Sequence, residues 1–191
     1  MKKFLAMFVA VVVMLAASVA MAADTKTVNL TATIPSSSSM NVTISKVVGT
    51  VFSTATSVAF GSLVLDPTYN IFKTSDGSYY AVDVGVNSNA SAWTVTHAVT
   101  SMTNGSSTLN NMINVTFMNQ ASASSGTQLS KVAYSASNGL VINKSQITTG
   151  GWIRIYYGLA TGSGDATGVV VIPATQPSGS YAGTVTLTLA P

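Results

Sequence analysis

Apolar and polar side chains alternate with a period of two along most of this chain, and this pattern constrains its fold more than any other feature. The alternation covers residues 27–34, 79–86, 93–100, 113–117, 153–157 and 184–189. Successive side chains of a strand point to opposite faces of a sheet, so each segment predicts a strand with one buried and one solvated side. Threonine and valine, both strand formers, occupy many of these positions. No segment has sustained helical periodicity, and we expect an all-β, antiparallel fold.

Turn residues separate the predicted strands at short intervals. Asp76-Gly77 lies between residues 71–73 and 79–86 and predicts a tight hairpin. Short strands joined by such turns are typical of a sandwich or barrel. We therefore expect residues 36–191 to form one antiparallel, Ig-like β-sandwich, with Ser36–Ser39 as a loop or hinge in front of it. Further turn pairs are Asn104-Gly105, Asn138-Gly139 and Gly150-Gly151.

The first residues have the three parts of a secretory signal peptide. Lys2 and Lys3 precede an apolar run over residues 4–17, and small residues follow at 20–23. This order predicts a signal peptide over residues 1–22, cut between Ala22 and Ala23. We expect export through the Sec pathway and the periplasm, and a secreted, extracellular or cell-surface location.

Charge and hydropathy exclude two classes of partner. Lys2 and Lys3 belong to the predicted signal, so six of the eight basic residues remain against five acidic ones, a net charge of +1. A nucleic-acid-binding domain needs a basic patch, and we expect no nucleic-acid partner. After Ala23 no apolar run approaches the roughly 20 residues of a spanning helix, so we expect no membrane span in the mature chain.

Residues that carry chemistry are scarce. The chain has one histidine and no cysteine, and it contains no glutamate and no nucleophile motif of the G-x-S-x-G type. The loop Thr161–Gly168 matches neither phosphate-binding pattern, because its glycines have the wrong spacing and a strand follows. We expect no enzyme activity, no metal and no cofactor, with His97 as a half-buried or rim histidine and Trp93 in the core.

One group of aromatic residues suggests a binding surface. Trp152, Arg154 and Tyr156 alternate with the apolar Ile153, Ile155 and Tyr157, so the two sets lie on opposite faces of one strand. We expect the face with Arg154 to point outward. Exposed tryptophan and tyrosine rings stack on sugar rings, so this face is a hypothetical glycan platform. Large aromatic residues also dominate cores and interfaces, and that interpretation remains open.

The C-terminal region resembles a known family. Residues 152–159 are followed by a bend at 173–177 and by the turn and strand Ser178–Leu189. This order resembles secreted bacterial pilin-type β-sandwiches, especially the spore-coat-U-like subunits of archaic chaperone–usher fibres. In those proteins a strand of the pattern P-x-G-x-Y-x-x-x-V-x-V-x-V closes the domain. The corresponding positions here are Tyr181, Val185, Leu187 and Leu189. The chain departs from the family in lacking its cysteine pair.

The resemblance implies a role for residues 23–35. Each subunit of such a fibre lacks one strand and receives it from the N-terminal extension of a neighbour. In this chain the strand residues would be Val28, Leu30, Ala32 and Ile34, with affinity from backbone hydrogen bonds. The alternative is that residues 23–35 form the first strand of their own sheet.

The resemblance implies a structural subunit of a bacterial surface fibre, pilus or coat, with copies or related subunits and a periplasmic chaperone and usher as partners. The second hypothesis is a cell-surface adhesion or carbohydrate-binding module.

Overall fold

The computed structural model describes residues 31–191. The predicted signal peptide, with Ala22 and Ala23, lies outside the described residues, as do Val28 and Leu30. The chain divides into two units, residues 1–35 and residues 36–191. In the described part of the first unit, Thr31–Pro35 carries no strand or helix and every side chain is exposed. Within residues 31–191, no helix is long and apolar enough to cross a membrane.

The second unit confirms the expected all-β, antiparallel fold. Residues 36–191 contain no α-helix and two short 3₁₀ turns, Ser135–Ser137 and Lys144–Gln146. The largest sheet has six strands in the order β10-β9-β12-β5-β1-β2, and every neighbouring pair is antiparallel. Its strands are β1 (Ser38–Val48), β2 (Val51–Ala55), β5 (Tyr79–Ser88), β9 (Ile113–Ser122), β10 (Ser125–Ala133) and β12 (Trp152–Leu159).

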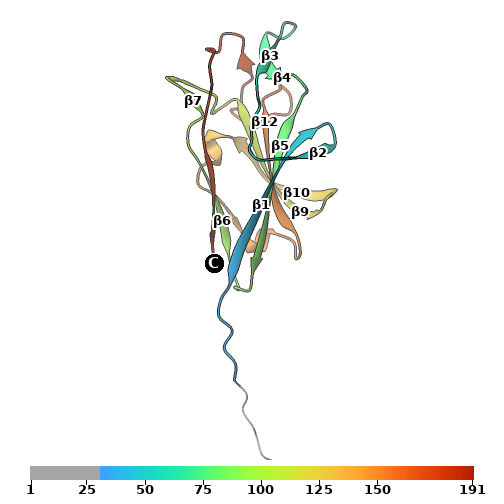
Figure 1. Cartoon of the computed structure of the whole chain (residues 1–191), viewed down its shortest axis with the longest axis vertical. Helices are drawn as coiled ribbons and strands as arrows, with labels where there is room; N and C mark the ends of the chain where they lie inside the picture. The colour runs from blue at the N-terminus through green and yellow to red at the C-terminus, as the bar shows by residue number, and fades with distance from the viewer. Residues whose placement is uncertain (1–30) are drawn as a thin grey trace, which may run out of the picture. The chain divides into compact units, whose positions relative to one another are not determined.

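Three smaller antiparallel sheets complete the second unit. The C-terminal strand β14, dark red in Figure 1, runs beside β6 in the three-stranded sheet β11-β6-β14. This sheet consists of β6 (Thr94–Val99), β11 (Leu140–Asn143) and β14 (Val185–Ala190). The others are β13-β4-β3, with β3 (Leu63–Asp66), β4 (Ile71–Thr74) and β13 (Ile172–Pro173), and the pair β7 (Thr103–Asn104) and β8 (Ser107–Thr108).

One hydrophobic core joins the six-stranded sheet to the smaller ones. On β12, Ile153, Ile155 and Tyr157 are fully or almost fully buried, as the alternation predicts. They pair with Val84, Val82 and Tyr80 of β5, so every second residue of both strands faces the same core. Strand β6 supplies its own alternate residues from the smaller sheet. The buried members on β6, β9 and β11 are Val95, Ile113, Val115, Phe117 and Ile142.

The predicted hairpin at Asp76-Gly77 is wrong. The turn itself exists, since Gly77 has φ +66° and its N–H donates to the Thr74 carbonyl at 3.4 Å. The flanking strands β4 and β5 do not pair, because β4 belongs to the β13-β4-β3 sheet and β5 to the six-stranded sheet. An Asp-Gly pair supplies the backbone angles of a tight turn, but it does not determine whether the strands on either side become partners.

Candidate functional site

The outer edge of β14 carries no strand partner among residues 31–191. Strand β14 pairs with β6 on one side only and ends its sheet. Leu187 lies opposite His97 and Leu189 opposite Val95, so both leucines face the core. They are nevertheless only half-buried, and Val185 on the same face is 38% exposed. An apolar row that faces the core and stays partly open to solvent marks a gap in the covering of that core.

A second open edge lies along the first half of β1. Strand β2 pairs with β1 only from Ile44 to Val48, so residues 38–43 have β5 as their sole strand partner among the described residues. Val42 on this half is opposite the buried Val84 of β5, which places it on the core face, yet it is 41% exposed. Met40 and Ile44 are half-buried against the same core as Leu187 and Leu189.

The residues of the two predicted strands occupy different places. Val185, Leu187 and Leu189 lie on β14, as described above. Tyr181 precedes that strand; its hydroxyl donates to the Pro177 carbonyl at 2.7 Å and accepts from Gln176 Nε2 at 2.9 Å. Of the N-terminal group, Ala32 and Ile34 are exposed, and Ile34 is 82% exposed.

Trp152, Arg154 and Tyr156 lie together on the outer face of β12, but Arg154 is not an exposed residue. Its side chain is only 7% exposed and pairs with Asp83 of β5 through two bonds, Nε to Oδ1 at 2.6 Å and a terminal nitrogen to Oδ2 at 2.9 Å. Trp152 Nε1 donates to the same Oδ1 at 2.9 Å. The guanidinium carbon lies 4.9 Å from the centre of the Phe52 ring, which β2 contributes. Trp152, Arg154, Tyr156, Asp83 and Phe52 are called the Arg154 cluster below.

The Arg154 cluster satisfies its own polar groups. The guanidinium also lies within 6 Å of the Trp152 and Tyr156 ring centres, a distance typical of cation–π contacts. The carboxylate of Asp83 raises the pKa of Arg154, so the cation is permanent. The face with Arg154 points away from the core, as expected, but Phe52 covers the guanidinium and Asp83 engages two of its nitrogens, so Arg154 itself is shielded from solvent. The cluster joins β2, β5 and β12 rather than presenting free donors to a sugar.

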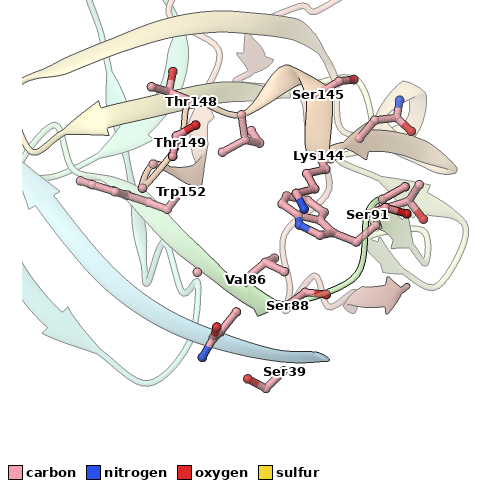
Figure 2. A pocket seen from close by; sticks show the side chains of 18 of the residues that line it. Ser39, Val86, Ser88, Ser91, Lys144, Ser145, Thr148, Thr149 and Trp152 are labelled. Carbon is pink, nitrogen blue, oxygen red and sulfur yellow. The ribbon is translucent and has the colours of Figure 1, made fainter. Parts of the chain in front are cut away.

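A cleft of about 1060 Å³ opens at the ends of β5, β6, β11 and β12. Figure 2 shows Trp152 and Thr149 at one end of this cleft, Ser91 at the other and Lys144 between them, with Val86 and Ser88 on the opposite wall. Trp93 and Trp152, the chain's only two tryptophans, both line it. Most other lining side chains are hydroxyls or amides. This site was not predicted.

Hydrogen bonds between neighbouring segments fix the walls of the cleft. Lys144 Nζ donates to the Ala90 carbonyl at 2.7 Å and so connects the two walls. Thr148, which lies on the upper wall in Figure 2, is held by Asn119 of β9: the Asn119 Oδ1 accepts from the Thr148 N–H at 3.1 Å, and the Asn119 Nδ2 donates to the Thr148 hydroxyl at 2.9 Å. Gly151 donates to the Thr148 carbonyl at 2.7 Å. A Cβ on Gly151 would lie 2.6 Å from the Gln120 carbonyl oxygen, so this turn requires glycine.

His97 is a core residue rather than the half-buried or rim residue that we expected. It is 1% exposed, with Nδ1 3.0 Å from the Ser137 carbonyl and Nε2 2.8 Å from the Tyr157 hydroxyl. A carbonyl only accepts, so Nδ1 carries the proton and Nε2 accepts from Tyr157. Burial lowers the pKa of His97 and raises that of Tyr157. The pair is a neutral, satisfied hydrogen-bond network inside the core.

The loop Thr161–Gly168 closes on its own aspartate. The Asp165 carboxylate accepts from the Gly162 N–H at 2.7 Å, from the Thr161 N–H and from Asn114 Nδ2 at 2.7 Å. These donors occupy the group that a cation would need. Within residues 31–191, no three His, Cys, Asp or Glu side chains gather into a metal-binding group.

The cleft and the cover over Arg154 both depend on contacts between distant segments. Trp152 and Ser88 line the same cleft only after β5 and β12 have paired, and Phe52 reaches Arg154 only because β2 extends the same sheet. Local alternation contains no signal for either contact. Comparisons with protein-family models, with curated proteins and with solved structures found no match to this chain.

Proposed function

We propose that the protein is a secreted, non-catalytic structural subunit of a bacterial surface fibre, pilus or coat, and that its copies assemble by strand pairing. In this proposal residues 36–191 are a pilin-like β-sandwich that lacks one strand. The missing strand is residues 23–35 of another copy, exported behind the signal peptide of residues 1–22. A periplasmic chaperone and usher would protect and deliver the subunits.

The observation that carries the proposal is the open edge of β14. A strand added there in trans would form backbone hydrogen bonds along β14 and cover Val185, Leu187 and Leu189. Each of these side chains would lose its remaining contact with water, and burial of apolar area stabilises by roughly 25 cal/mol per Å².

The N-terminal segment has the chemistry of such a strand. Val28, Leu30, Ala32 and Ile34 recur at every second position, so one face of the extended segment is apolar and the other carries threonine and asparagine. Ile34 is 82% exposed, so its side chain is accessible to a second copy. The charge-poor, threonine-rich surface also suits a protein that packs against copies of itself.

The geometry supports an adhesion module with Trp152, Arg154 and Tyr156 as its glycan platform less well than it supports strand pairing. In the hypothetical platform of Trp152, Arg154 and Tyr156, Asp83 accepts from the Trp152 indole and from two Arg154 nitrogens, and Phe52 covers the guanidinium, so Arg154 offers little surface to a sugar. The experiment that tests the leading proposal is electron microscopy of the purified mature protein, with and without residues 23–35. We expect fibres from the mature chain and none from the truncated chain.

A matched pair of variants locates the contact. Leu187→Asp places a charge on the open core face of β14 and should abolish fibres, whereas Thr188→Asp places it on the opposite face and should leave them. Circular dichroism checks that each variant folds. Fibres that form equally well without residues 23–35 would refute strand exchange.

A further inference from the structure

The two tryptophans of the cleft are in different hydrogen-bonding states. Trp152 is half-buried, and its indole N–H donates to Asp83 at 2.9 Å. Trp93 is 7% exposed, yet within residues 31–191 its indole N–H donates to no protein acceptor. Gln120 Oε1 is the one buried side-chain polar atom of residues 31–191 without a partner, so the Trp93 N–H is open to solvent and can donate to water or to a ligand. The cleft therefore contains one fixed aromatic ring and one available donor.

The lining of the cleft is mostly neutral and polar. None of the described lining residues is acidic, and the single cation, Lys144, donates to the Ala90 carbonyl. Asn87, Ser88, Ser91 and Asn143 belong to a larger set of hydroxyl and amide side chains along the walls. These groups both donate and accept hydrogen bonds. A cationic ligand would find no carboxylate here and an anionic one would find a single ammonium, whereas a neutral ligand with many hydroxyl groups would find partners on every side.

The cleft is also preformed. Its volume of about 1060 Å³ lies at the upper end of the range for small-molecule sites. The bond from Lys144 to Ala90 and the two bonds from Asn119 to Thr148 fix its walls without a ligand. A fixed site loses little conformational entropy when a ligand binds.

We propose that this cleft binds a neutral oligosaccharide, which packs against the Trp152 ring and accepts a hydrogen bond from the indole N–H of Trp93. The site shares Trp152 with the Arg154 cluster, but Phe52, Asp83, Arg154 and Tyr156 do not line it. The proposal does not rest on fibre assembly, because the binding residues all belong to one copy.

The first experiment titrates the purified protein with neutral hexasaccharides of glucose, mannose and N-acetylglucosamine. Since the only two tryptophans of the chain line the cleft, tryptophan fluorescence reports on this site alone. We expect a saturable change with at least one sugar and a dissociation constant below about 1 mM. No saturable change with any of the three sugars would overturn the proposal. So would a synthetic peptide of residues 24–35 that binds the cleft and displaces the sugar, because the cleft would then belong to strand exchange.

A matched pair of variants separates the cleft from the Arg154 cluster. Trp93→Phe keeps an aromatic ring but removes the N–H, and we expect sugar affinity to fall by about 2- to 10-fold in isothermal titration calorimetry. Tyr156→Phe alters the cluster outside the cleft and should leave the affinity unchanged. Unchanged affinity in Trp93→Phe, or weaker binding in Tyr156→Phe alone, would contradict the assignment. Thermal unfolding of both variants verifies the fold.

Discussion

Removing the Asp83 carboxylate should destabilise the protein far more than removing an exposed carboxylate. Asp83 accepts two bonds from Arg154 and one from Trp152, all between 2.6 and 2.9 Å. In Asp83→Ala these three donors lose their acceptor together. The Arg154 side chain is 7% exposed, so its charge would remain largely shielded from water and without a counter-ion. Desolvation of this unpaired cation is the physical cause of the predicted loss.

The magnitude follows from the exposure of the two partners. Breaking a buried ion pair by removing one side costs about 3–5 kcal/mol. The Asp83 side chain is 28% exposed, so water enters the space it leaves and replaces part of the lost bonding. We therefore expect a loss of about 2–3 kcal/mol in the free energy of unfolding. For a domain of this size each kcal/mol shifts Tm by roughly 2–4 °C, which gives a decrease of about 4–12 °C.

Urea unfolding followed by far-ultraviolet circular dichroism measures this loss. The double variant Asp83→Ala/Arg154→Met carries no unpaired charge, so it should be more stable than Asp83→Ala alone. Asp76→Ala is the more exposed control, because Asp76 pairs with Lys46 at 2.7 Å where both side chains are about 40% exposed and also accepts from the Ser78 N–H at 3.1 Å; we expect a smaller loss there. An Asp83→Ala protein as stable as the parent would refute the reasoning, and so would a double variant less stable than the single one.

Three further predictions concern the core, a turn and a loop. Burial holds the pKa of His97 below 6.5 in the folded protein, so the unfolded chain takes up a proton first as pH falls below about 6.5. The urea midpoint of unfolding should therefore decrease between pH 7 and pH 5. The variant His97→Asn should remove that decrease. Gly151→Ala should cost about 1–3 kcal/mol through overlap with two backbone carbonyls, whereas Gly85→Ala meets nothing within 4 Å; equal urea midpoints would contradict this. Asp165→Ala should release the bonds from Thr161 and its neighbours, and limited proteolysis should cut the loop faster than in the parent protein.

Local alternation predicted which side chains of a strand face the core. Ile153, Ile155 and Tyr157 are buried as their spacing indicates, and Trp93 is in the core. This success has a simple cause: the alternation of side chains is a property of a single strand and needs no knowledge of its partners. The outer face of a strand is less predictable. Arg154 lies on the outer face, but a residue from β2 covers it, and no pattern within residues 152–159 contains that information.

Strand pairing was the part that sequence could not supply. Asp76-Gly77 forms the turn that its residues favour, yet it links two sheets instead of one hairpin. The cleft has the same origin, because residues near 88–94 and 143–152 meet only once the sheets have formed. Both are outcomes of tertiary packing, which overrides local preference.

The sheet edges differ in their features, and this difference predicts which edge strand receives a neighbouring copy in the proposed assembly. Strand β10 carries Lys131 and two register shifts, features that discourage pairing between edges. Strand β14 is the longest edge strand in the described part of the chain without a charge, a proline or a register shift. If residues 23–35 of one copy pair with β14 of the next, the contact joins two different surfaces and extends into an open filament.

A chain without residues 23–35 would still accept a strand but would have none to donate. Added in small amounts to the mature protein, it should cap filaments and shorten them in electron micrographs, whereas unchanged filament lengths would show that growth does not pass through this segment.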